Sequence, residues 1–283
     1  MSCPILTYHS QNIRSNRYGE NDHVALKADL ESLRNHGKRL IGLTTLVDWL
    51  LADIDDGSLD DAVCITFDDG CKLEISDEIV PGYGLQSSFL SILKDFRKQQ
   101  PVDTPHQVRA TTFVLADAAV REQMDRESLF GLGWMQADWW AAVKAEGIID
   151  VQSHGWDHLH NMQPDVLGEK LPHARFVSID SLDKCELQVY RAGQVIANGC
   201  GGVKPQYFAY PYGAASVYMR DTYLPENISR TCIRAAFSTQ PAHVTLASSR
   251  WNIPRYVCGR DWQTPQQFDA ILDGAFAASL PAS

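Results

Sequence analysis

Positive charge is scarce in this sequence of 283 residues: 25 lysines and arginines stand against 35 aspartates and glutamates, a formal net charge of -10. Nucleic acids and anionic membrane surfaces select proteins that concentrate positive charge, so we expect neither as a partner. The sequence also lacks an apolar run long enough to cross a bilayer and the basic, apolar start of a secretory signal.

Paired cysteine motifs are absent as well. The seven cysteines form no C-x-x-C pair, and their odd number leaves at least one thiol unpaired. Disulfide frameworks belong to oxidising compartments, so this usage favours a reducing one. We therefore expect a cytoplasmic protein.

Linkers, internal repeats and low-complexity blocks are missing too, which favours a single domain over residues 1–283. Short apolar runs, several of them apolar on both faces as in buried parallel strands, alternate with stretches of helical spacing. The runs are Ile5–Tyr8, Leu40–Leu43, Ala62–Phe67, Ala110–Leu115, Ile148–Val151, Tyr207–Tyr210, Ile233–Phe237 and Ile253–Val257. The helical stretches include Leu26–Leu33, Phe89–Phe96, Ser181–Asn198 and Phe268–Ala275. The alternation predicts an α/β fold with a parallel sheet, and seven or eight strands in one domain favour a barrel.

Two adjacent carboxylates follow the buried run Ala62–Phe67. Asp68 and Asp69, with Gly70 behind them, stand at the carboxyl end of a predicted strand, where parallel sheets carry their active sites. Neighbouring strand residues point to opposite sides, so we expect one acid on a metal and the other over substrate. Taken alone, Asp-Asp-Gly slightly favours a simple helix cap or turn over a site.

A second polar segment, Ser153–His158, follows the predicted strand Ile148–Val151. Its two histidines, His154 and His158, lie four residues apart and can converge on one ion if the segment makes a helical turn. Together with one carboxylate they would form a metal site of three ligands with an open position. Alone the pair fits a solvated turn, but beside the two aspartates the metal interpretation is favoured.

The third segment, Phe208–Gly213, again follows a strand-like run. Pro211 restricts the backbone and Gly213 permits a tight turn, so the amide of Tyr212 can be presented rigidly to a developing oxyanion. Tyr210 and Tyr212 also suit stacking on a sugar ring. Without the other two segments, this one would fit an ordinary loop.

In these three segments and their order, the sequence resembles the metal-dependent polysaccharide deacetylases of the NodB-homology type. The resemblance runs from about Pro4 to Ala278 and includes Ile5–His9 and Ala110–Val114. It implies a distorted (β/α) barrel of about seven parallel strands. It also implies one divalent metal, commonly zinc, with cobalt, nickel or manganese as alternatives.

The resemblance further implies a role for each matching residue. Asp69, His154 and His158 would be the metal ligands, and Asp68 would be the general base that takes a proton from the attacking water. Tyr212 would stabilise the oxyanion through its amide. The residues expected to line the substrate groove are Tyr210, Pro211, Trp156, Arg255 and His9.

The sequence departs from the family pattern at two catalytic positions. Ala209 replaces the arginine that often pairs with the catalytic aspartate, and Arg255 is our candidate for that partner, although a surface arginine fits equally well. Leu272–Gly274 replaces a late Leu-x-His whose histidine acts as general acid. The remaining candidates for the acid are His9, His160 and His243.

The leading hypothesis is a hydrolase that removes an N-acetyl or O-acetyl group from a sugar. One alternative keeps the metal chemistry but acts on a small cyclic amide or ureide, as allantoinase-like relatives do. Another is a carbohydrate-binding member without turnover, which the two departures would suit. The sequence leaves the substrate and the oligomeric state open.

Overall fold

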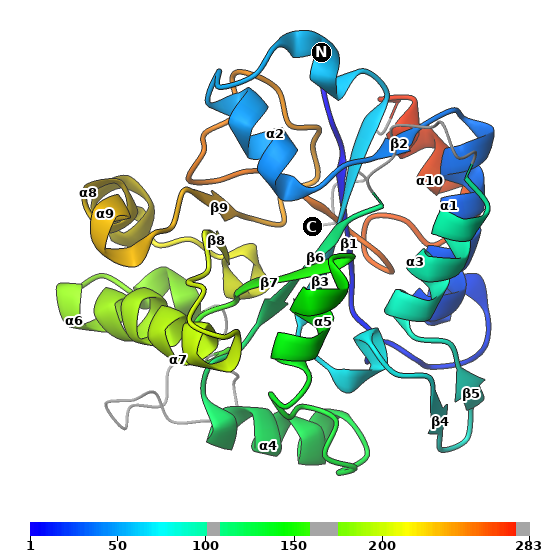
Figure 1. The fold of residues 1–283 in the computed structure, drawn as a ribbon, viewed down its shortest axis with the longest axis horizontal. Helices are drawn as coiled ribbons and strands as arrows, with labels where there is room; N and C mark the ends of the chain where they lie inside the picture. The colour runs from blue at the N-terminus through cyan, green and yellow to red at the C-terminus, as the bar shows by residue number, and fades with distance from the viewer. Residues whose placement is uncertain (101–107, 159–174, 276–283) are drawn as a thin grey trace, which may run out of the picture.

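The computed structural model describes residues 1–100, 108–158 and 175–275. Its main sheet is parallel throughout, with strand order β10-β1-β3-β6-β7-β8-β9 and with β2 paired beside β3 (Figure 1). The strands are β1 (Ile5–Tyr8), β2 (Arg39–Leu40), β3 (Ala62–Asp69), β6 (Ala110–Val114), β7 (Ile149–Ser153), β8 (Tyr207–Ala209), β9 (Ala235–Phe237) and β10 (Tyr256–Val257). A separate antiparallel hairpin contains β4 (Glu78–Val80) and β5 (Gly84–Gln86).

One segment joins the two ends of this sheet. Ile253 bridges Phe237 of β9 in parallel, and β10, three residues later, pairs with β1. The strands therefore curl into the distorted (β/α) barrel that the sequence predicted. Arg255 lies in this closing segment.

Helices cover the outside of the curled sheet. α1, α3 and α10 lie together on one side, and α6, α7, α8 and α9 lie together on another (Figure 1). The helices are α1 (Asp22–Asn35), α2 (Leu43–Leu50), α3 (Phe89–Lys98), α4 (Ala118–Ser128), α5 (Trp140–Glu146), α6 (Leu182–Cys185), α7 (Ala192–Gly199), α8 (Leu224–Glu226), α9 (Ile228–Thr231) and α10 (Pro265–Leu272). Among the described residues we find no helix with the length and hydrophobicity needed to span a bilayer.

Side-chain alternation along the strands separates two faces of the sheet. On β3, Val63, Ile65 and Phe67 pack with the outer helices, whereas Ala62 and Cys64 face an inner cluster that α2 covers. The same alternation places Thr66 and Asp68 on the inner face. The inner face thus carries apolar residues at one end of the barrel and polar ones at the other.

Three local predictions need correction. Leu40–Leu43 is not one strand, because β2 ends at Leu40 and the apolar spacing of the following residues forms α2. Ile253–Val257 is not one continuous strand. It forms a single bridge at Ile253 and the two-residue strand β10, because Pro254 has no N–H to donate to a neighbouring strand. The helix predicted over Ser181–Asn198 is present but contains the π-helical segment Glu186–Arg191 between α6 and α7.

Candidate active site

A cavity of about 390 Å³ opens at the carboxyl ends of the strands. It lies within the size range of small-molecule sites, ~300–1,000 Å³. Six of the predicted or candidate residues meet there although they come from four separate parts of the chain. The lining residues are His9, Gln11, Asp68, Asp69, Met124, Leu129, Met135, His154, His158, Tyr212, Thr239, Val257 and Arg260.

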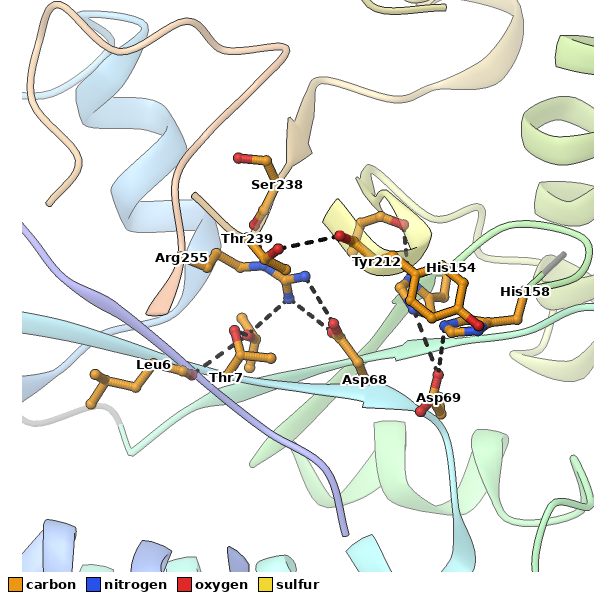
Figure 2. Close-up of polar contacts among 12 residues, drawn as sticks. Leu6, Thr7, Asp68, Asp69, His154, His158, Tyr212, Ser238, Thr239 and Arg255 are labelled. Carbon is orange, nitrogen blue, oxygen red and sulfur yellow. Dashed lines mark hydrogen bonds and ion pairs between the residues drawn. The ribbon is translucent and has the colours of Figure 1, made fainter. Parts of the chain in front are cut away.

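Asp68 is bound by Arg255 (Figure 2). Two guanidinium nitrogens of Arg255 donate to the two carboxylate oxygens of Asp68, each at 2.8 Å, and both side chains are buried. Arg255 also donates to the Thr66 hydroxyl at 3.1 Å and to the Ser238 carbonyl at 3.0 Å. The predicted partner of Asp68 is therefore present, but it lies behind the carboxylate and not on the cavity wall.

This pairing controls the charge of Asp68. Burial opposes ionisation of the carboxyl, but the adjacent guanidinium of Arg255, together with the neighbouring histidines, outweighs burial and lowers the pKa of Asp68 below its ordinary value. An ionised carboxylate with two hydrogen bonds is held in one orientation. Asp68 is thus ionised at neutral pH.

Asp69, His154 and His158 form a second group in the same cavity (Figure 2). Their potential ligand atoms all lie within 4.8 Å of one another. Asp69 Oδ1 is 3.6 Å from Nε2 of His154 and 3.4 Å from Nε2 of His158. This oxygen is buried and has no hydrogen-bond partner among the described residues.

The protonation states of this group suit a cation. Nδ1 of His154 lies 2.9 Å from the Ala209 carbonyl, which can only accept, so Nδ1 carries a proton and Nε2 is the nitrogen that faces Asp69. Burial lowers the pKa of His158 to about 4, which keeps its imidazole neutral. Two imidazole Nε2 atoms beside a carboxylate oxygen that lacks a hydrogen-bond partner fit a divalent metal.

Backbone geometry brings both carboxylates into one cavity. Strand alternation would turn Asp69 away from the side of Asp68, but Asp69 has a φ of +80° and so turns back at the end of β3. Gln11 donates to the second oxygen of Asp69 and fixes its orientation. The two acids therefore have different partners, Arg255 for Asp68 and the two histidines for Asp69, but both face the cavity.

The two histidines converge through a bend and not through a helical turn. Gly155 has a φ of +95°, and a Cβ there would lie 3.0 Å from Oε1 of Gln188. The Gln188 side chain accepts from the Trp156 amide and donates to Asp157, so it holds the bend from a distant helical segment. The glycine between the histidines is thus required by the backbone.

Tyr212 is the exposed member of the third segment. It has φ 56° and ψ 10°, a left-handed conformation that is uncommon outside glycine. Its ring packs against that of His158 with centroids 4.2 Å apart, and about half of the side chain is exposed, 49%. Tyr212 therefore borders both the metal-site candidate and the opening of the cavity.

Besides Arg255, three of the expected groove residues do not line the cavity. Tyr210 is fully buried on the outer face of the sheet beside Phe208, and its hydroxyl donates to the Trp251 carbonyl at 2.8 Å. Pro211 is buried beneath the turn. Trp156 is partly buried, and its indole donates to Asp117 at 2.8 Å. Strand alternation turns Tyr210 outward, which the aromatic composition of the segment did not indicate.

The candidates for the general acid lie in different parts of the molecule. His9 lines the cavity, and its amide donates to Asp22 at 2.7 Å. His243 borders a different cavity, and its ring contacts the Ile271 carbonyl at 2.7 Å. His160 lies outside the described residues. Of the two described candidates, only His9 is near Asp68 and Asp69.

Sequence reasoning missed several cavity residues. Met124, Leu129 and Met135 form an apolar wall that continues into a buried cluster, and Thr239 and Arg260 also line the cavity. None of them belongs to a recognisable motif. Thr239 lies two residues after the apolar run Ile233–Phe237, and this position was an available signal, because strand ends collect site residues.

Comparison with solved structures agrees with this architecture. IcaB from Ammonifex degensii superposes with a TM-score of 0.62 at 20% identity, covering 98% of this chain and 97% of that one. The Streptococcus pyogenes deacetylase PplD, solved with acetate, has a TM-score of 0.63 at 13% identity, covering 97% and 98%. A de-N-acetylase from Aggregatibacter actinomycetemcomitans has a TM-score of 0.62 at 15% identity, covering 95% and 100%. At these identities the likeness shows the fold.

Sequence comparison adds the family. No curated protein matches the chain significantly. The sequence profile of the polysaccharide deacetylases matches residues 56–224, more than half of the chain, and this range includes Asp68, Asp69, both histidines and Tyr212. The chain therefore belongs to the polysaccharide deacetylase family.

Proposed function

We propose that this protein is a metal-dependent hydrolase that removes an acetyl group from an acetylated sugar, with an N-acetyl group as the first candidate. One observation carries the proposal. A carboxylate kept ionised by a buried arginine lies in the same cavity as a buried Asp-His-His group that fits a cation. A base beside a Lewis-acid site is what hydrolysis of an unactivated amide requires.

Asp69, His154 and His158 would hold the metal, for which zinc is the first candidate. When bound, such a cation polarises a carbonyl and favours ionisation of water. Asp68 takes the proton from the attacking water, and Arg255 keeps Asp68 ionised and in position.

The other cavity residues complete the reaction. The amide of Tyr212 donates to the oxyanion that forms as water adds to the carbonyl carbon. His9 delivers a proton to the leaving nitrogen as the carbon–nitrogen bond breaks, so that acetate and a free amine result. The apolar wall of Met124, Leu129 and Met135 suits the methyl of the acetyl group.

Acetate release from zinc-loaded protein tests this function. The panel contains N-acetylglucosamine, its oligosaccharides, O-acetylated sugars and small cyclic amides, with Asp68→Asn as the blank and metal content measured in each sample. Release from a sugar that disappears in the variant is the expected result. Opening of a cyclic amide without acetate release would overturn the substrate class, and no turnover by protein with one metal per chain would overturn the enzymatic function.

A further inference from the structure

Two residues that directly follow β9 connect the two halves of the site (Figure 2). Ser238 accepts a hydrogen bond through its carbonyl from Nε of Arg255 at 3.0 Å, and thereby braces the arginine that holds Asp68. The next residue, Thr239, donates its hydroxyl to the Tyr212 carbonyl at 3.3 Å. Neither residue belongs to one of the three sequence motifs.

Arg260 orients the Thr239 hydroxyl. Its Nη1 donates to Thr239 Oγ1 at 3.0 Å, and its Nη2 donates to the Thr239 carbonyl. Because the hydroxyl has a single proton and here accepts from arginine, that proton is left for Tyr212. Asp261 accepts from Nη2 of the same guanidinium at 2.7 Å and also accepts from the Val257 amide at 2.7 Å. The guanidinium of Arg260 is therefore held between Thr239 and Asp261.

The turn that contains Tyr212 needs such a restraint. Tyr212 is left-handed at φ 56°, which costs free energy for any residue with a Cβ. The following Gly213 packs so closely on Thr239 that a Cβ at Gly213 would lie 2.2 Å from Thr239 Oγ1. Its amide also donates to the Tyr210 carbonyl at 2.8 Å. The peptide after Tyr212 is thus held from both sides.

The restraint reaches the reacting atoms through the backbone. The peptide planes before and after Tyr212 are joined by its φ and ψ, so holding its carbonyl also sets the direction of its N–H. An oxyanion donor works only when it points at the place where charge develops. The hydrogen bond from Thr239 to the Tyr212 carbonyl therefore helps to fix the direction of the Tyr212 N–H, the proposed oxyanion donor.

We propose that Thr239, oriented by Arg260, is a positioning residue that keeps the Tyr212 amide directed at the oxyanion. The proposal rests on the proposed function. Because Thr239 and Arg260 both line the cavity, they could instead bind the sugar directly, and the two roles predict different kinetics. A positioning role changes kcat, whereas a contact with the sugar changes KM.

Thr239→Val and Thr239→Ser form a matched pair, because valine keeps the shape and removes the hydroxyl whereas serine keeps the hydroxyl. With an N-acetylglucosamine oligosaccharide as substrate, we expect Thr239→Val to lower kcat about tenfold to a hundredfold, below the ~10²–10³ for complete loss of a donor. We expect KM, zinc content and thermal unfolding to stay near wild type. Thr239→Ser should restore kcat, and Arg260→Met should resemble Thr239→Val.

Wild-type kcat in Thr239→Val would overturn the proposal, and so would an equal loss in Thr239→Ser or a change confined to KM. A second readout does not depend on turnover. In ¹⁵N spectra, the Tyr212 amide should shift or broaden in Thr239→Val and remain near its wild-type position in Thr239→Ser. If the wild-type protein proves inactive, the proposed function fails, and an unchanged Tyr212 resonance in Thr239→Val would separately overturn the positioning role.

Discussion

Replacing Arg255 with methionine should destabilise the protein strongly, although methionine has a similar length and packs well. Arg255 is fully buried, and the change would remove both hydrogen bonds to Asp68 and those to Thr66 and Ser238. It would also remove the cation from above the Phe113 ring, 5.2 Å from its centroid. Asp68 would remain buried without a countercharge. Breaking one side of a buried ion pair costs about 3–5 kcal/mol, a large share of an unfolding free energy of ~5–15 kcal/mol.

Urea unfolding followed by circular dichroism measures this loss. Arg126→Met is the control, because the Arg126–Glu122 pair is exposed and should change stability by less than about 1 kcal/mol. Adding Asp68→Asn to Arg255→Met should recover part of the loss, since no buried charge would then remain unpaired. Equal unfolding free energies for Arg255→Met and Arg126→Met would refute the reasoning. Acetate release by Arg255→Met should fall to the level of Asp68→Asn.

Three further predictions concern separate parts of the molecule. His158→Asn should abolish stoichiometric zinc binding after dialysis without changing the circular dichroism spectrum, and one retained zinc per chain would contradict the assigned ligands. Burial raises the pKa of Asp29 from 3.8 to about 7, so the folded protein holds a proton that the unfolded chain has released. Stability should therefore fall by about 3 kcal/mol as the pH rises from ~4 to 7, and urea unfolding across this range should show a flatter profile for Asp29→Asn. Tyr210→Phe should cost about 1 kcal/mol of stability, because the buried Trp251 carbonyl loses its donor, and should leave kcat/KM for acetate release unchanged. A tenfold fall in kcat/KM would show that Tyr210 acts in the site after all.

The sequence was sufficient to predict the type of fold. Buried strands in a parallel sheet are apolar on both faces and helices carry one apolar stripe, so both leave a local record. The motifs at the ends of β3 and β7, and after β8, then indicated where the site would form, because parallel strands bring their carboxyl ends to one edge. The sequence did not give the element boundaries where a strand pattern passes into a helix pattern within a few residues, as at Leu40–Leu43.

The partners within the site were decided by the tertiary structure. Arg255 meets Asp68 across 187 positions of chain, and only closure of the barrel, with β10 paired to β1, brings the Arg255 side chain to Asp68. Tyr210 and Tyr212 have the same aromatic character in the sequence, but strand alternation buries the first and a left-handed turn exposes the second. Local patterns report which residues are buried or exposed on their own element. Which of two distant polar groups face each other depends on how the strands register and where the backbone turns, and that is settled only when the whole sheet closes.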